Sequence, residues 1–149
     1  LSVREAKGLA YYISTSTDEY LDCGTFSTSA GVSVDRIYEA VEAIIREYQK
    51  VMDGGITEAE LEKAKSYLMG KLTLRLEDSE EYAHLLGKFE LLLNKVRTVE
   101  DIETMIRKVT VDEVNELAKK IIKPGELRMS IIGPYADEER FSKLMEKFV

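Results

Sequence analysis

The first regular pattern in the chain is an alternation of apolar and polar residues. It covers residues 9–16 and again residues 23–30, and both segments are rich in Tyr, Ile, Thr and Ser, which are typical of strands. The short segment 17–22 connects them, so an antiparallel pair is the simplest arrangement. Within this pattern Cys23 is expected to be a small buried residue of the second strand.

A helical pattern replaces the alternation after Ser33, which is placed to cap a long amphipathic helix. Gly54 and Gly55 end this helix, and Thr57 with Glu60 has the spacing of a capping box at the start of the next one. The apolar residues of the first helix recur at intervals of three and four positions, and they are Val34, Ile37, Tyr38, Val41, Ile44, Ile45 and Tyr48.

The second helix is predicted to bury one stripe, and a break near residues 77–79 separates it from a third helix. Thr98 and Thr110 each have an acidic residue three positions later, which marks the starts of two short helices. The expected core positions of the second helix are Leu61, Ala64, Leu68 and Leu72, and those of the third are Tyr82, Leu85, Leu86, Phe89, Leu92 and Leu93.

The C-terminal part predicts one more strand and one more helix. Pro124 and Gly125 end the helical block, residues 127–131 alternate, and Gly133-Pro134 stops the alternation. We therefore expect an α+β fold, with a small antiparallel or mixed sheet and a layer of amphipathic helices on one face, in a single domain over residues 1–149. The final helix carries Phe141, Leu144, Met145 and Phe148.

Composition narrows the classes of partner. Hydrophobic residues make up 44% and charged residues 33% of the 149 residues, and the formal net charge of −7 argues against the basic surface that nucleic acid requires. No apolar run is long enough for a membrane span, and no signal-peptide pattern is present. Cys23 is the single cysteine and forms no internal disulfide, which fits a reducing compartment, so a cytoplasmic location is expected.

The N-terminal segment carries two hydrogen-bond donors near one turn. A helix that closes at Gly8 places Arg4 in its last turn, where a cation suits the helix dipole. Tyr11 follows near the start of the first strand, so the reversal brings two groups that donate to a carbonyl or an oxyanion towards one rim. The alternative is an arginine that closes a helix and a tyrosine that packs in a sheet. Tyr12 competes with Tyr11, although strand alternation sends it to the opposite face.

The other chemistry-bearing residues point to structural roles. His84 is the single histidine, so neither a two-histidine metal motif nor a histidine-activated serine is available, and its helical position predicts an exposed side chain. Acidic residues gather at predicted helix starts, where the helix dipole favours them, in no calcium-binding spacing. Gly54-Gly55 lacks the Lys-Ser/Thr of a phosphate-binding loop. We therefore predict no metal site within this segment.

Several motifs, in chain order, resemble the second half of pitrilysin-type (insulinase-like) zinc peptidases, the group that includes mitochondrial processing peptidase. The segment VREAKGLAYYI at residues 3–13 is similar to the family's signature of Arg, six residues and Tyr. Residues 23–26, CGTF, resemble the family's second strand, and residues 53–61, DGGITEAEL, resemble the start of one of its helices. Residues 127–134 resemble the closing strand, so the resemblance spans nearly the whole chain.

This resemblance implies the C-terminal half of a clamshell endopeptidase, the half that lacks zinc and is inactive alone. Catalysis in the family is similar to that of the H-x-x-E-H inverzincins, so zinc is implied for the complementary half. Tyr11 would then donate a hydrogen bond towards the scissile region of a peptide substrate, and Arg4 would hold a substrate backbone carbonyl. An N-terminal zinc-binding half or a partner subunit is the expected partner.

The same resemblance predicts an incomplete sheet. Relative to the family's repeated unit, the opening strand and most of the first helix are expected to be missing, and the chain begins with Leu1. A sheet without its leading strand exposes an edge, so we expect pairing with another chain in a homo- or hetero-oligomer. Two other functions stay open: a catalytically inactive Arg/Tyr partner or structural core subunit, and a peptide-binding module that adds extended segments to the exposed edge.

Overall fold

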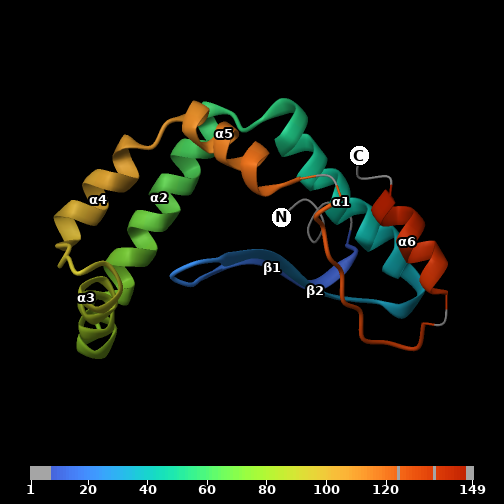
Figure 1. Cartoon of the computed structure of the whole chain (residues 1–149), viewed down its shortest axis with the longest axis horizontal. Coiled ribbons are helices and arrows are strands. Elements are labelled where there is room, and N and C mark those ends of the chain that lie inside the picture. The colour runs from blue at the N-terminus through green and yellow to red at the C-terminus, as the bar shows by residue number, and fades with distance from the viewer. Residues whose placement is uncertain (1–7, 124, 136, 147–149) are drawn as a thin grey trace. The chain divides into compact units, whose positions relative to one another are not determined.

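The computed structural model describes residues 8–123, 125–135 and 137–146. These residues form an antiparallel strand pair, one turn of 3-10 helix at Val34–Arg36 and six α-helices, so the predicted α+β class is confirmed (Figure 1). The strands are β1 (Ala10–Glu19) and β2 (Gly24–Val32), and the helices are α1 (Ile37–Gly54), α2 (Glu58–Arg75), α3 (Ser79–Leu93), α4 (Val99–Lys108), α5 (Val111–Ile121) and α6 (Glu138–Glu146).

The described residues divide into two compact units. The first unit lies within Leu1–Gly55 and Leu117–Val149 and contains both strands, α1 and α6. The second unit is Ile56–Glu116 and contains α2, α3 and α4. The chain passes from the second unit back to the first within α5. The single domain over residues 1–149 stays a prediction.

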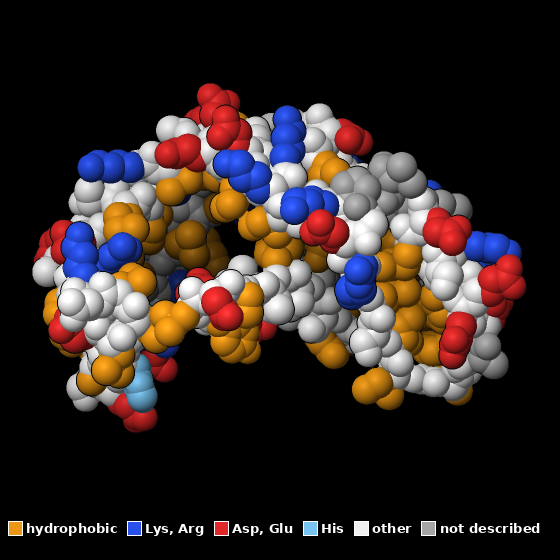
Figure 2. Space-filling model, viewed as in Figure 1, with side chains coloured by type: hydrophobic (Ala, Val, Ile, Leu, Met, Phe, Trp, Pro, Cys, Tyr) orange, Lys and Arg blue, Asp and Glu red, His pale blue; other side chains and the backbone are white. Residues whose placement is uncertain are grey.

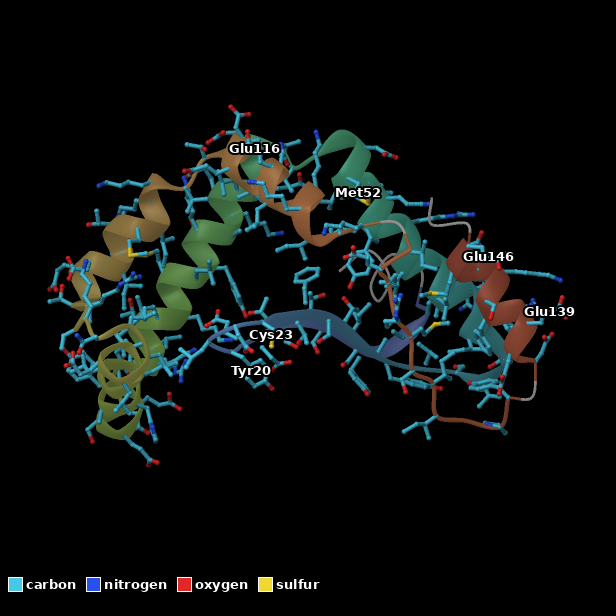
Figure 3. All side chains as sticks on the ribbon, viewed as in Figure 1. Tyr20, Cys23, Met52, Glu116, Glu139 and Glu146 are labelled. Carbon is cyan, nitrogen blue, oxygen red and sulfur yellow. The ribbon has the colours of Figure 1, made fainter. Side chains whose placement is uncertain are left out.

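β1 and β2 form an antiparallel hairpin, as the alternation predicts. The backbone N–H of Tyr20 donates to the carbonyl oxygen of Cys23 at 3.0 Å and closes the turn, where Figure 3 labels both residues. Cys23 is an exposed loop residue, so the prediction of a small buried strand residue is wrong. The reason is that β1 continues to Glu19 and the turn itself then occupies the positions up to Cys23.

The core of the first unit forms around α1, which packs against the hairpin and against α6 (Figure 1). Leu9 is buried with Ala40 and Ala43, small residues of α1 that let the hairpin approach the helix closely. The hydroxyl oxygens of Thr28 and Tyr48 lie 2.6 Å apart and add a polar contact between β2 and α1. The predicted stripe is confirmed from Ile37 onward, but its first member, Val34, is 55% exposed in the 3-10 turn. The second cluster consists of Ile37, Val41 and Ile45 with Phe141 of α6.

Residues 127–131 pack against this core without joining the sheet. Among the residues that the structure describes, the sheet contains β1 and β2 alone, so the predicted third strand is wrong. Leu127 and Ile131 are half-buried against the cluster of α1 and α6, which explains why this sequence alternates. Alternation reports which side chains are buried, whereas a strand also requires a neighbouring backbone with which to exchange hydrogen bonds.

The helices of the second unit have strong local caps and little buried surface. The capping boxes predicted at Thr57 and Thr98 are both present. Thr110 exchanges the same two hydrogen bonds with Glu113, at 2.8 and 3.3 Å. Leu61 is buried, but the predicted stripe of α2 does not continue beyond it, because Leu68 is 49% exposed.

Apolar side chains lie on the surface of the second unit, as the orange groups in Figure 2 show. An apolar surface of this kind is typical of regions that contact other protein groups. No helix in the described part of the chain is long and apolar enough to cross a membrane. The most exposed of these apolar residues are Tyr67, Leu74, Leu91, Leu93 and Val96.

Candidate functional site at the start of the hairpin

Tyr11 lies at the start of β1, where the pairing between the two strands is irregular. Ala10 pairs with Val32. The next pair is Tyr12 with Gly31, so the register shifts and Tyr11 is left without a partner in the ladder. An extra residue of this kind bends the strand and redirects a side chain, and such bulges recur next to active sites. Because Tyr11 is 72% exposed, its phenol is presented to solvent.

The phenol of Tyr11 has one defined polar contact, with the side chain of Ser33. The two hydroxyl oxygens lie 3.0 Å apart. Ser33 directly follows β2 and occupies the N-cap position of the 3-10 turn, but its side chain makes no cap hydrogen bond. The turn is closed instead by the backbone N–H of Arg36, which donates to the Ser33 carbonyl oxygen at 3.1 Å. The Ser33 hydroxyl is therefore available to the tyrosine.

Arg36 connects the same corner to the residue that precedes β1. Its Nη1 donates to the carbonyl oxygen of Gly8 at 3.5 Å, and its Nη2 forms an ion pair with Glu39 at 2.9 Å. Gly8 has a φ of +56°, a left-handed conformation that glycine adopts without steric cost. The segment between Gly8 and Tyr11 is thus contacted at both of its ends by residues of one turn.

Tyr12 makes a different contact from its neighbour. A Cβ atom added at Gly31 would lie 2.3 Å from a ring carbon of Tyr12, which places that ring directly over the glycine. The phenol of Tyr11 instead contacts Ser33. The two adjacent tyrosines are therefore not equivalent, and it is Tyr11 whose hydroxyl contacts the side chain of Ser33.

The sequence-predicted site residues are only partly within the described structure. Arg4 lies outside the described residues. His84, on α3 of the second unit, is exposed as predicted, and its Nε2 lies 3.7 Å from a carboxylate oxygen of Glu80. Among the described residues no group of three His, Cys, Asp or Glu side chains is placed to hold a metal ion. The described site therefore offers a hydrogen-bond donor rather than a metal ligand set.

The sequence predicted Tyr11 as a site residue, but not its contact with Ser33 or the contact of Arg36 with Gly8. A serine before a helix predicts a helix cap, so the sequence does single out Ser33. That prediction concerns a hydrogen bond to the helix, however, and not a contact with Tyr11 on β1. Arg36 carried no such signal, because an arginine in a first helical turn is common in any sequence. Their proximity to the start of β1 depends on the hairpin pairing, which brings residues 22 positions apart into contact.

Comparison with known proteins found a matching family and several similar proteins. Residues 1–68 match the family described as Peptidase M16 inactive domain. The chain is 33% identical over 147 residues to an uncharacterized zinc protease of Mycobacterium leprae, covering 99% of this chain and 33% of that protein. It is 32% identical over 132 residues to the uncharacterized zinc protease YmxG of Bacillus subtilis, covering 89% of this chain and 32% of that protein. The chain thus spans about a third of the length of these relatives.

Two solved structures are similar to this chain in fold. A chain of Complex III2 from Candida albicans, with Inz-5 bound, has a TM-score of 0.72 at 17% identity, over 81% of this chain and 29% of that chain. A conserved protein from Enterococcus faecalis has a TM-score of 0.65 at 27% identity, over 79% of this chain and 27% of that chain. At 17% identity the first likeness concerns the fold alone.

Proposed function

We propose a function from one premise: the chain belongs to the peptidase M16 family and carries its inactive domain. In this proposal the chain is the substrate-positioning half of a zinc-dependent endopeptidase that encloses and cleaves peptides. The complementary half, on the same polypeptide or on a partner subunit, holds the zinc. The described residues of this chain form no metal site, so no catalytic step that involves the metal is assigned to them.

The exposed phenol of Tyr11 is the observation that carries the proposal. A side chain that donates to a scissile carbonyl must reach solvent, must keep a proton to donate, and must be held at a fixed place. Tyr11 is 72% exposed, lies at the register shift of β1, and contacts Ser33 at 3.0 Å. These are the properties of a presented donor, whereas a tyrosine that only packs in a sheet would be buried against its neighbours.

Arg4 is the second residue of the proposal. Its place seven positions before Tyr11 matches the family signature, and by that match it holds a backbone carbonyl of the peptide while Tyr11 donates near the scissile bond. A guanidinium suits this role because it is always charged and offers several N–H donors. A cytoplasmic location belongs to the same proposal and rests on the single, exposed Cys23.

The second candidate function is a partner or structural subunit without catalysis of its own. The similarity in fold to a chain of Complex III2 favours it, as does the apolar surface of the second unit, which suits contact with other protein. The two candidates differ in what they require of Tyr11. A purely structural subunit does not need a phenol at this position.

The deciding experiment measures zinc content and cleavage of an unstructured peptide by the complete protein, before and after Tyr11→Phe. We expect stoichiometric zinc, and a fall in turnover of about 10²–10³-fold, since this is the usual cost of removing one donor to transition-state charge. Tyr12→Phe is the matched control, because it removes the neighbouring exposed phenol from the same strand, and we expect it to retain activity.

Each alternative function predicts a different result in this experiment. Cleavage that is unchanged in Tyr11→Phe would reject the catalytic role of this tyrosine. Absence of both zinc and cleavage would reject the endopeptidase proposal and favour the partner or structural subunit. Peptide binding without zinc anywhere in the system would favour a module that captures extended segments at a sheet edge.

A further inference from the structure

We propose that Ser33 is a positioning residue for Tyr11. The Ser33 hydroxyl holds the phenol of Tyr11 in place and directs the phenolic proton outward to the substrate. This inference rests on the proposed function for its catalytic consequence, but its structural part concerns one contact and can be tested separately. It assigns to Ser33 a role that its place before a helix does not predict.

The Ser33 hydroxyl is not used by the helical turn that it precedes. A serine at this position normally accepts a hydrogen bond from a backbone N–H of the first turn. In this chain the 3-10 turn is closed by a backbone bond to the Ser33 carbonyl, and the side chain makes no cap bond. Its oxygen instead lies 3.0 Å from the phenolic oxygen of Tyr11. A residue at a helix-capping position therefore contacts β1 and not the helix.

The hydrogen bond between Tyr11 and Ser33 can run in either direction. Each hydroxyl has one proton and can also accept. If Tyr11 donated to Ser33, its proton would be occupied and could not reach a substrate oxygen. If Ser33 donates to the phenolic oxygen, the tyrosine proton is left free, and the accepted bond makes the phenol a stronger donor through cooperativity. The proposed function of Tyr11 therefore requires Ser33 to be the donor.

The same turn also contacts the backbone just before the strand. Arg36, three positions after Ser33, donates to the carbonyl oxygen of Gly8 and is itself held by Glu39. Two residues of one turn thus contact the backbone before Tyr11 and the tip of its side chain. A residue at a strand irregularity needs such outside contacts, because the ladder does not hold it.

The structural test is NMR of this chain with 13C at Cζ of tyrosine, a nucleus that responds to hydrogen bonding of the phenol. Tyr11→Phe identifies the Tyr11 resonance by its disappearance. We expect Ser33→Ala to move that resonance and Ser33→Thr, which retains a hydroxyl, to restore it. Ser29→Ala, which removes an exposed hydroxyl from the same strand pair, should leave it in place. An unmoved Tyr11 resonance in Ser33→Ala would overturn the inference.

The functional test is peptide cleavage by the complete protein. We expect Ser33→Ala to lower kcat about tenfold with little change in KM, which is the size of effect that one hydrogen bond typically has. Ser33→Thr should recover most of the rate. The double variant Tyr11→Phe/Ser33→Ala should be no slower than Tyr11→Phe alone, because Ser33 acts through the phenol.

The two proposals fail in different ways. If Tyr11→Phe retains full turnover while Ser33→Ala still moves the Tyr11 resonance, the catalytic function of Tyr11 is wrong and the contact is structural. If Tyr11→Phe is slow but the double variant is clearly slower still, Ser33 acts independently of Tyr11 and the positioning role is wrong.

Discussion

The two units of this chain are stabilised in different ways. Seven of the eight buried hydrophobic residues described lie in the first unit, where they join segments far apart in sequence, whereas Leu61 is the one in the second. Among the residues that the structure describes, the three reciprocal pairs of a threonine and an acidic residue at helix starts all lie in the second unit. Long-range packing therefore holds the unit that carries the candidate site, and local hydrogen bonds define the helices of the other.

The largest expected effect comes from removing the aromatic ring that joins α6 to α1. Phe141 is buried, stacks on Tyr38 with ring centroids 4.7 Å apart, and meets Tyr135 edge-on at 5.8 Å. We expect Phe141→Ala to lower the free energy of unfolding by about 3–5 kcal/mol, through lost burial and the cavity that remains. Denaturant unfolding followed by circular dichroism measures it. A loss below about 1 kcal/mol would mean that α6 contributes little to the first unit.

Removing a helix cap in the second unit should cost less. The Thr98 hydroxyl accepts from the backbone N–H of Asp101 at 3.2 Å, and we expect Thr98→Ala to destabilise by about 1 kcal/mol, the usual cost of losing a cap. Thr73→Ala is the control, because the Thr73 hydroxyl bonds back to the carbonyl of Met69 within α2 and alanine is a better helix former. Equal losses in the two variants would contradict the capping argument.

Acidification should weaken the second unit through its caps. In each pair the threonine backbone N–H donates to the carboxylate and lowers its pKa. A pKa that is lower in the folded state stabilises the fold above the unfolded pKa, and the contribution is lost as the pH falls through the folded pKa. We expect helicity to decline below about pH 4, and Glu60→Gln to reduce this decline. The pairs are Thr57–Glu60, Thr98–Asp101 and Thr110–Glu113.

The pH prediction is contradicted if the circular-dichroism titration of Glu60→Gln superimposes on that of the unmodified chain. Glutamine keeps a side chain that accepts a hydrogen bond but does not titrate in this range. The comparison therefore separates the charge of the carboxylate from its capping geometry.

The smallest effect is expected for exposed apolar residues of the second unit. Leu74 is 70% exposed on α2, so we expect Leu74→Ala to change the free energy of unfolding by no more than about 0.5 kcal/mol in this chain. The measurement is the same denaturant unfolding that is used for Phe141→Ala. A loss of 2 kcal/mol or more would show that the surface of α2 is covered in solution, and would break the contrast between the two units.

Features that depend on a few neighbouring residues could be predicted from the sequence. The capping boxes at Thr57 and Thr98 follow from residues three positions apart, and the buried face of α1 follows from a three- and four-residue spacing. The exposed position of His84 followed from the same helical spacing. In each case the forces that decide the structure act within one or two helical turns.

Features that depend on distant segments could not be predicted. The prediction of a third strand was wrong because the alternation of residues 127–131 arises from packing on helices and not from backbone pairing. The register shift at Tyr11 and its contact with Ser33 are set by how β1 meets β2, which no local pattern encodes. The role of Arg4 stays a prediction, since that residue lies outside the described structure.

The hairpin turn has a practical consequence that follows from Cys23. This residue is the single cysteine of the chain, it is exposed, and it lies at the opposite end of the hairpin from Tyr11. A maleimide spin label or fluorophore would therefore attach at one defined point, with no cysteine to add or remove. The hairpin of this chain thus carries its own reporter position, from which the movement of its tip can be followed.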